Sequence, residues 1–560
     1  MSAADPPKPA DAPERADPRE LTESIDADVA VVGAGPVGLT LAGRLAQGGM
    51  RVIVIERAPR HTGEGSKAIC MQRETLEIWS REGIGEQVAG RGVQWQIGRT
   101  YYRGRELFSV QLPGSSTEHF PPFVNISQSE VEEMLLERCQ QLGVDLRWGH
   151  ELRGLTDDGV AVTLDVATES STLTLRVRNV VGADGAHSSV RHLLGVDFPG
   201  HSHEDLFLIC DIRARLAYPH ERRFFFDPPW NRGRQVLIHP QPDDTWRVDW
   251  QVASETDVKA ERANGGLDRR IRAVIGSATP YELAWATVYR FHQRLAASFR
   301  VGNAFLVGDA AHLYAPFGAR GLNSGVADAE NLAWKLGMVV RGDAPPALLD
   351  TYELERRAAA VENLAVTDAT MRFMVPHGPW QRLWRNLTLR GSTRFGFLRR
   401  RVNSGRLAEP FSYAGSPIIS PASNHSELPR HGAVAPDAPI SVGARRTRLR
   451  EVVPDDAFLL LVVAGDHWRR RLAPTPPVAA PCQVLVLVAG EGAAQVPPGT
   501  RAIGDPSGAL RSIYAPSGDR AWLIRPDAHL AGSVALGRDD GLEGALGLIG
   551  RASGRELVSG

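Results

Sequence analysis

The stretch that decides the fold is Val29-Ala30-Val31-Val32-Gly33-Ala34-Gly35-Pro36-Val37-Gly38. Four apolar residues predict a short strand, and Gly33, Gly35 and Gly38 follow it with the spacing of a turn that opens a helix. Glycine lets the backbone turn tightly there and approach a pyrophosphate, which the helix N-terminus attracts. The stretch therefore predicts a dinucleotide site at the start of a βαβ unit.

A second apolar strand, residues 51–55, completes this unit and ends in Glu56. An acidic side chain at this position can accept hydrogen bonds from a ribose, and it favours a ribose without a phosphate. Arg57 follows Glu56 directly, and we include it among the expected cofactor contacts.

Composition excludes several classes of protein. The chain has 560 residues with 64 basic and 65 acidic side chains, so it lacks the basic surface of a nucleic-acid partner. None of its four cysteines forms a CxxC pair, which argues against a disulfide framework or a structural zinc site. The longest apolar run, residues 457–464, is far shorter than the about 20 residues of a membrane span. We expect a cytoplasmic, multidomain protein without nucleic-acid or membrane partners.

Patterning along the chain predicts four regions. Residues 1–27 are expected to be a disordered leader, residues 28–400 the main domain, residues 401–440 a linker and residues 441–560 a C-terminal domain. Within the main domain, residues 200–295 predict an inserted antiparallel sheet, because aromatic and β-branched residues dominate them. Residues 100–125 are polar and interrupted by Gly and Pro. Helices are expected at residues 129–142, after Asn323 and between 350 and 400, and buried strands at 458–463 and 484–488.

Two further motifs place acidic residues after apolar strands. Residues 180–191 carry Asp184 in a Gly-rich turn, and residues 304–312 carry Asp309. A Gly-rich loop, residues 316–325, then leads into a long helical pattern. Ligands of open α/β sheets bind at the carboxyl ends of such strands. Each motif alone is also compatible with a structural turn.

Together, in this order and spacing, the three motifs resemble the group A flavoprotein aromatic hydroxylases, which share the para-hydroxybenzoate hydroxylase fold. The resemblance covers residues 28–400 and is closest to the 3-(3-hydroxyphenyl)propionate and phenol hydroxylase branch, through residues 66–70 and 73–77. The tail, including residues 522–527, resembles the thioredoxin-like domain of that branch, without a redox CxxC. The implied fold class is α/β: a Rossmann-like FAD-binding domain with an inserted antiparallel-sheet substrate domain, plus a C-terminal thioredoxin-like α/β domain.

The resemblance implies FAD as cofactor and a set of residues that contact it. Lys67 stands where many relatives carry arginine, and Arg320 replaces a glutamine that is common in this loop. The implied cofactor contacts are Gly33, Gly35, Gly38, Glu56, Arg57, Lys67, Gln128, Asp184, Asp309, Pro316, Gly321, Leu322 and Asn323.

The resemblance also implies a reaction. NADH or NADPH reduces FAD, O2 adds to the flavin, and a flavin C4a-hydroperoxide transfers one oxygen atom to a phenolic ring, ortho to an existing hydroxyl. The partner is then a small aromatic substrate, either free or tethered to a carrier protein. The resemblance also admits a homodimer.

Substrate contacts are expected on the inserted sheet, where alternate residues share one face. His239 is a candidate catalytic base, because imidazole titrates near neutrality; its alternative is a hydrogen-bonded sheet histidine. Asp249 and Gln251 are candidate substrate contacts, and Phe317 is a candidate apolar wall beside the flavin.

Other functions remain open at this point. A halogenase of related fold would carry a Trp-x-Trp-x-Ile-Pro motif, which residues 246–250 fail to match. The cofactor motifs do not distinguish a hydroxylase from a flavoprotein epoxidase or a reductase of a non-phenolic substrate. A non-catalytic FAD-binding protein is a further alternative.

Overall fold

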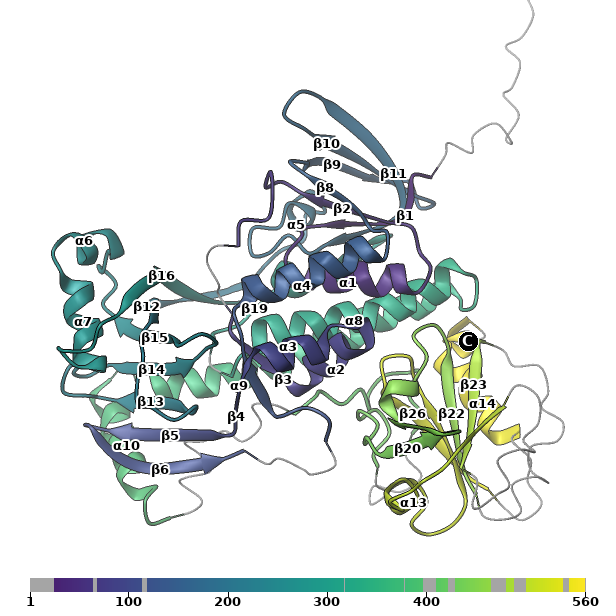
Figure 1. The fold of residues 1–560 in the computed structure, drawn as a ribbon. Coiled ribbons are helices and arrows are strands. Elements are labelled where there is room, and N and C mark those ends of the chain that lie inside the picture. The colour runs from purple at the N-terminus through teal and green to yellow at the C-terminus, as the bar shows by residue number, and fades with distance from the viewer. Residues whose placement is uncertain are drawn as a thin grey trace, which may run out of the picture.

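A computed structural model describes residues 25–63, 68–112, 118–316, 318–376, 378–395, 409–421, 429–464, 480–487, 500–536 and 543–558. It consists of a large α/β body that contains two extended sheets, and a smaller sheet near the C-terminus that docks against the helices of this body (Figure 1). The mixed α/β fold class is confirmed.

The first sheet is the nucleotide-binding type that the opening stretch predicts. Its centre is β1 (Ala27–Val32), flanked in parallel by β2 (Val52–Glu56) and β11 (Thr172–Gly182). The strand order is β17-β18-β11-β1-β2-β8, and β9 and β10 extend it beside β11. The remaining strands are β8 (Asp145–Trp148), β9 (Glu151–Asp157), β10 (Val162–Ala167), β17 (Arg300–Val301) and β18 (Ala304–Leu306).

Helices α1 (Pro36–Gln47), α4 (Gln128–Gln141) and α8 (Arg320–Val340) pack together beside this sheet (Figure 1). The expected helix 129–142 is α4. Helix α8 begins three residues before the expected Asn323, because Ala319 takes a left-handed φ of 53° at its N-cap. The shift matters, since it places the Gly-rich loop and the first turn of α8 at the edge of the sheet.

The second sheet has the order β19-β16-β12-β15-β14-β13-β5-β6 and is antiparallel except where β13 pairs with β5. Its central strands confirm the sheet expected at 200–295, and α6 (Val258–Ala263) and α7 (Gly266–Ile275) lie beside it. The strands are β5 (Ile97–Tyr102), β6 (Arg105–Gln111), β12 (Gly200–Arg213), β13 (Arg222–Phe226), β14 (Gln235–Pro240), β15 (Thr245–Val252), β16 (Glu282–Leu295) and β19 (His312–Leu313).

Strands β5 and β6 arise from the polar region for which no element was expected. Buried and less buried residues alternate along β5, so only one face of this strand is buried. A strand buried on one face needs few apolar residues, and its sequence therefore resembles that of a loop. A small third sheet has the strand order β3 (Cys70–Gln72), β7 (Phe123–Asn125) and β4 (Val93–Trp95). Helices α2 (Arg73–Glu82) and α3 (Gly85–Arg91) lie between β3 and β4 along the chain.

The chain then forms α9 (Asp350–Met374) and α10 (Pro379–Gly391), in the region expected to be helical. The C-terminal part is a five-stranded sheet of order β24-β23-β22-β25-β26, in which β22, β23 and β24 run parallel. A separate two-stranded sheet, β20-β21, precedes it along the chain. The elements of the C-terminal part are β20 (Pro439–Val442), β21 (Arg445–Arg448), β22 (Phe458–Val463), β23 (Cys482–Leu487), β24 (Thr500–Ile503), α13 (Ala509–Tyr514), β25 (Arg520–Ile524), β26 (Leu530–Ala535) and α14 (Glu543–Ala552).

Strand β22 matches the expected 458–463, and β23 begins two residues before the expected 484. The thioredoxin-like assignment and the four domain boundaries stay predictions. Residues 409–421 of the expected linker are in part tightly packed, with Tyr413 3% and Ile418 0% exposed. No helix among the described residues is long and apolar enough to cross a membrane.

Candidate active site

A cavity of about 610 Å³ lies between the first sheet and the inner face of the second. Its walls bring together segments far apart in the sequence: the Gly-rich turn after β1, the end of β2, the loops after β11 and β18, and the start of α8. The opposite wall is formed by β12 to β16. The arrangement joins a nucleotide-binding edge to a sheet face in one continuous space.

The Gly-rich turn is held by Glu56. One carboxylate oxygen accepts a hydrogen bond from the Ala34 amide and the other from the Ala58 amide, each at 2.9 Å. A Cβ at Gly38 would lie 2.1 Å from the carbonyl oxygen of Gly33, so this glycine serves close packing of the helix on the turn. A Cβ at Gly35 would meet nothing within 4 Å, and Gly35 lines the cavity. The open space at Gly35 suits a ligand that approaches the backbone.

The motif around Asp184 forms the next wall. Its Oδ2 accepts hydrogen bonds from the amides of Ser189 and Val190, at 2.6 and 3.2 Å, while Oδ1 is buried without a partner among the described residues. Burial raises the pKa of Asp184. Arg191 donates to the carbonyls of Ala186 and Ala310, both at 2.9 Å, and thereby ties this loop to the Asp309 turn.

Asp309 lies in the 3-10 turn Gly308–Ala310 and lines the cavity. Behind the turn, the buried carboxylate of Asp328 accepts from the Gly308 amide at 3.0 Å and from Arg356 at 2.6 Å, and lies 2.6 Å from His312 Nε2. Although burial alone would raise it, His312 and Arg356 hold the pKa of Asp328 below its ordinary value. This carboxylate therefore fixes the turn from inside the protein.

Pro316, Gly318, Ala319 and the first turn of α8 form the cavity edge beside β3. The amide oxygen of Asn323 accepts from the Gln72 amide and the Thr75 hydroxyl, at 2.9 and 2.7 Å, and its NH2 donates to the Cys70 carbonyl at 2.9 Å. Gln128 accepts from the Ala68 amide at 3.2 Å. These contacts hold β3 beside the loop.

The structure places most of the expected cofactor residues around one cavity. Those that line it are Gly33, Gly35, Glu56, Arg57, Gln128, Asp184, Asp309, Pro316, Gly321, Leu322 and Asn323. Gly38 is not among them, because it packs against the turn. Lys67 and Phe317 lie outside the described residues. The open backbone at Gly35 and the unpaired buried oxygen of Asp184 fit a bound dinucleotide such as FAD.

The wall opposite is rich in aromatic side chains. His239 and Asp249 both line the cavity, from adjacent strands β14 and β15, and Gln251 is 5% exposed but does not line it. The aromatic residues of this wall and of the loops beside it are Trp95, Phe123, Phe207, Phe224, Phe226, Trp285, Tyr289 and Phe291. Such a surface can hold an aromatic ring and keep water away from it.

Two titratable groups on this wall have opposite shifts. Burial and the charges of Arg222 and Arg247 lower the pKa of His239 to about 3, so the imidazole is neutral. Burial raises the pKa of Asp249 to about 7, although Arg247 opposes the shift. Asp249, with a pKa of about 7, is therefore a group on this wall that can exchange a proton near neutral pH.

Two arginines of the cavity wall, Arg222 and Arg247, were not expected from the sequence. Arg222 begins β13, and the residues two and four positions later, Phe224 and Phe226, share its face. The sequence does show a charged residue in alternation with two aromatic residues. This pattern identifies a residue of the cavity wall only when the register of the sheet is known.

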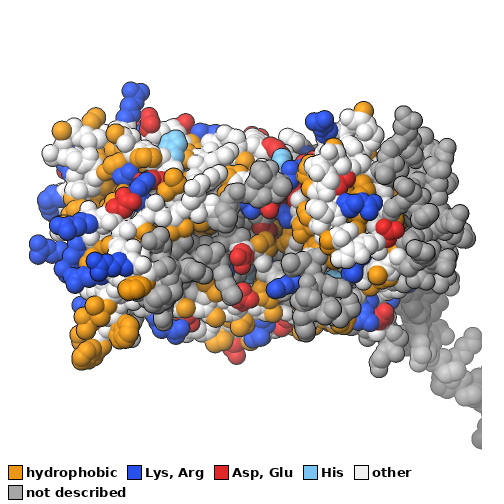
Figure 2. Space-filling view, turned by 90° about the horizontal axis from the view of Figure 1, so that it is seen from below, with side chains coloured by type: hydrophobic (Ala, Val, Ile, Leu, Met, Phe, Trp, Pro, Cys, Tyr) orange, Lys and Arg blue, Asp and Glu red, His pale blue; other side chains and the backbone are white. Residues whose placement is uncertain are grey.

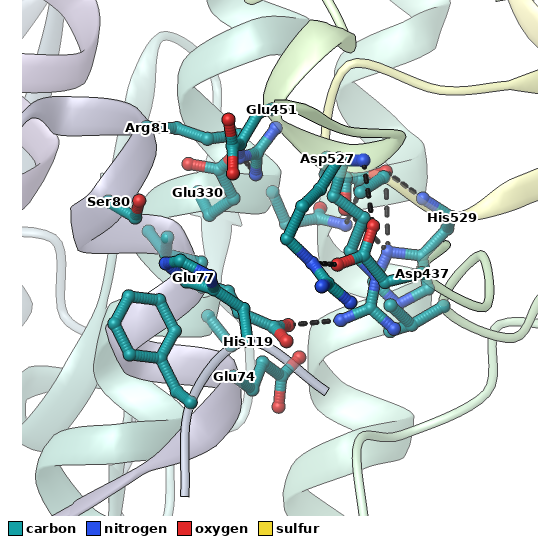
Figure 3. Close-up of a pocket in the computed structure, with 18 of the residues that line it drawn as sticks. Glu74, Glu77, Ser80, Arg81, His119, Glu330, Asp437, Glu451, Asp527 and His529 are labelled. Atoms are coloured by element: carbon teal, nitrogen blue, oxygen red, sulfur yellow. Dashed lines mark hydrogen bonds and ion pairs between the residues drawn. The ribbon is translucent and has the colours of Figure 1, made fainter. Parts of the chain in front are cut away.

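A smaller cavity of about 50 Å³ lies where α2 meets the C-terminal part (Figure 3). Ion pairs cross or border it, including Glu77 with Arg450 and Glu330 with Arg81. Burial raises the pKa of Glu74 and of Glu77. The space is well below the about 150 Å³ of a cavity that holds benzene, so we assign it to the junction between the two parts.

Comparison with known proteins identifies the class. Residues 26–367 match a protein-family model described as an FAD binding domain. The chain is 30% identical over 531 residues to 6-methylpretetramide 4-monooxygenase of Streptomyces rimosus, with 91% of each chain covered. It is 28% identical to 3-(3-hydroxy-phenyl)propionate/3-hydroxycinnamic acid hydroxylase of Mycolicibacterium smegmatis, covering 93% of this chain and 92% of the relative.

Among solved structures, the flavin-dependent monooxygenase PieE in complex with FAD and substrate superposes with a TM-score of 0.76 at 22% identity. The superposition covers 96% of this chain and all of PieE, and it shows the common fold. The chain belongs to the FAD binding domain family and is an FAD-dependent monooxygenase. The resemblance to aromatic hydroxylases and the expected cofactor are thereby confirmed.

Proposed function

We propose that the chain hydroxylates the phenolic ring of a polycyclic aromatic compound, with FAD, O2 and NADH or NADPH. The observation that carries the proposal is the single cavity that joins the nucleotide-binding edge to an aromatic sheet face bearing Asp249. The similarity to a 6-methylpretetramide monooxygenase over 91% of the chain favours a polycyclic substrate, and the similarity to a 3-(3-hydroxy-phenyl)propionate hydroxylase over 93% of the chain makes a simple phenylpropanoid the second candidate. The epoxidase, reductase and non-catalytic alternatives are not favoured by these relatives.

FAD, once reduced by a nicotinamide, supplies the oxygen-activating chemistry. The protein holds the cofactor through the Gly-rich turn, Glu56, Asp184 and the Asp309 turn, and the aromatic wall orients the ring and excludes water. Asp249 takes the proton of the phenol, because its pKa near neutrality matches that task better than the pKa of His239. His239, as a neutral imidazole, is then a hydrogen-bond partner of the ring hydroxyl.

NADH and NADPH oxidation by the flavin-loaded protein, against a panel of mono- and polycyclic phenols with mass spectrometry of the products, tests this proposal. We expect one polycyclic phenol to accelerate oxidation and to gain a single oxygen atom, ortho to a hydroxyl. Faster oxidation without an oxygenated product would identify an effector. Conversion of alkenes in place of phenols would contradict the proposal.

We further propose that the substrate binds free and that the chain forms a homodimer. Exposed apolar side chains lie among charged ones on the underside of the molecule (Figure 2). Helix α10 exposes Trp380 by 75% and Trp384 by 71%, together with Leu383 and Leu387. Light scattering of the protein and of a Trp380→Ser/Trp384→Ser variant tests the dimer, and a pantetheine-linked aryl probe tests for tethering.

A further inference from the structure

The side chain of Arg222 faces the cavity from the first position of β13. Its guanidinium lies over the Trp95 ring, 5.8 Å from the centroid. The neighbouring strand carries Gly98 opposite Arg222, and a Cβ there would come within 3.4 Å of the guanidinium. The sheet thus leaves room for a cation at one end of an aromatic wall.

Arg222 differs from the arginines around it in having no counter-charge. Arg247 forms two hydrogen bonds with Asp211, both at 2.8 Å. Arg99 and Arg223 both pair with Glu221, at 2.8 and 3.0 Å. Arg222 forms no ion pair with any described residue, and its Nε is buried without a hydrogen-bond partner there.

Two described groups near Arg222, the Cys70 thiol and the His239 imidazole, are neutral. Burial raises the pKa of the Cys70 thiol to about 12, so it carries no charge at neutral pH, and the imidazole of His239 is neutral as well. Burial also lowers the pKa of Arg222 itself, as expected for a cation without an acidic neighbour. A partly desolvated, unpaired cation is costly, and a bound anion would remove that cost.

Arg222 and the Gly-rich turn line the same cavity from two different sheets. Arg222 belongs to the second sheet, whereas Gly35 and Glu56 belong to the first. The Cys70 sulfur lies 3.9 Å from His239 Nδ1, and the Cys70 carbonyl accepts from Asn323. Arg222 is therefore near the substrate wall and the Pro316–Asn323 edge together.

We propose that Arg222 binds an anionic oxygen of the substrate, either a carboxylate or the oxygen of an ionised phenol or enol. Arg222 thereby selects anionic aromatic substrates and fixes which end of the ring system enters first. The inference rests on the proposed function, since it assigns a substrate class to the same site. Arg222 is a binding residue and takes no part in proton transfer.

Binding to the flavin-loaded protein tests the proposal. The probes are anthraquinone-2-carboxylate and its methyl ester for a carboxylate, and alizarin and its methyl ether for an ionised phenol. Affinity is read from the perturbation of flavin absorbance, and alizarin ionisation from its colour. The variants are Arg222→Gln, Arg222→Lys and the control Arg223→Gln, whose side chain pairs with Glu221.

We expect Arg222→Gln to weaken the anionic probes at least tenfold and to leave the neutral ones unchanged, with partial rescue by Arg222→Lys. For an ionised phenol, the acidic shift of bound alizarin in the wild type is lost in Arg222→Gln. Arg223→Gln should behave as the wild type. The two probe pairs show whether a carboxylate or a phenolate is preferred.

Equal weakening of anionic and neutral probes would overturn the proposal, because Arg222 would then act through packing. Loss of FAD from Arg222→Gln would overturn it too, since Arg222 would be a cofactor contact. So would a wild type that binds neither anion. Arg222-dependent anion binding without hydroxylation of any phenol contradicts the proposed function alone, whereas hydroxylation without an anion preference contradicts this inference alone.

Discussion

Burial acts on individual carboxyl groups of this protein in ways that the sequence does not reveal. Asp249 lies between two tryptophans on β15, and its Oδ1 is buried without a partner among the described residues. Glu82 ends α2, is 0% exposed, and neither of its carboxyl oxygens has a partner in the described chain. Both groups have raised pKa values, but only Asp249 faces the cavity.

Replacement of Asp249 by Asn should lower kcat/KM by about 100-fold or more, the usual contribution of a general base. In the wild type kcat/KM should rise with pH through about 7, as Asp249 loses its proton, and the variant should lack this limb. The control is His239→Gln, which should keep the limb, because the pKa of His239 lies well below the assay range. A pH limb that persists in Asp249→Asn and disappears in His239→Gln would identify His239 as the base.

Glu82 should affect stability. Its pKa is about 8 in the folded chain against 4.5 ordinarily, so the folded state keeps a proton that the unfolded state loses. The free energy of unfolding should therefore fall as pH rises from about 4.5 to about 8, by a few kcal/mol at about 1.4 kcal/mol per pKa unit. Glu82→Gln should flatten the dependence of Tm on pH, whereas exposed Glu137→Gln should not. A slope unchanged by Glu82→Gln would refute this role.

At the scale of elements, the sequence predicts those whose geometry is local. The strand, turn and helix around Gly33 are specified by residues within one short stretch, and the helix α4 by its own apolar spacing. Strand β5 pairs with β13, more than a hundred residues away, and β6 forms the sheet edge beside β5, so neither strand is specified by its own sequence alone. The position of Arg222 on the cavity wall depends on the same long-range register.

The two glycines of the turn should respond differently to alanine. Gly38→Ala places a Cβ against the Gly33 carbonyl and should destabilise the apoprotein by about 1–3 kcal/mol, a typical cost of overpacking. Gly35 has an ordinary φ of −76° and open space, so Gly35→Ala should keep the Tm of the apoprotein but lower FAD retention after dialysis. Full FAD occupancy in Gly35→Ala would show that no ligand approaches the backbone there.

At the scale of the whole molecule, a buried charge network joins the two parts of the chain. Arg525 of the C-terminal part donates to both oxygens of Glu355 on α9, at 2.7 and 2.9 Å, and Lys335 donates to the same carboxylate at 2.8 Å. Arg525 and Lys335 are 0% exposed. These cations hold the pKa of Glu355 well below its ordinary value, against the effect of burial.

Glu355→Gln should lower the stability of the whole chain by about 3–5 kcal/mol, because it leaves two buried cations with too little negative charge. Differential scanning calorimetry measures the loss. The matched control is Asp350→Asn on the same helix, which removes a pair with Arg300 where Asp350 is 68% exposed and should cost less than about 1 kcal/mol. Equal losses of stability in the two variants would show that the buried network stabilises the chain no more than an exposed ion pair does.

The contact of Arg356 with both Asp328 and the Tyr413 hydroxyl, at 2.6 and 2.8 Å, has a consequence for protein engineering. Arg356 is connected through Asp328 to the turn Gly308–Ala310 on the cavity wall, and through Tyr413 to the segment that leads into the tail. A chimera that takes its tail from a relative must therefore keep a hydroxyl that accepts the hydrogen bond from Arg356, as Tyr413 does here. Tails of this fold are best exchanged at a junction before residue 409, so that the donor of the tail also supplies the partner of Arg356.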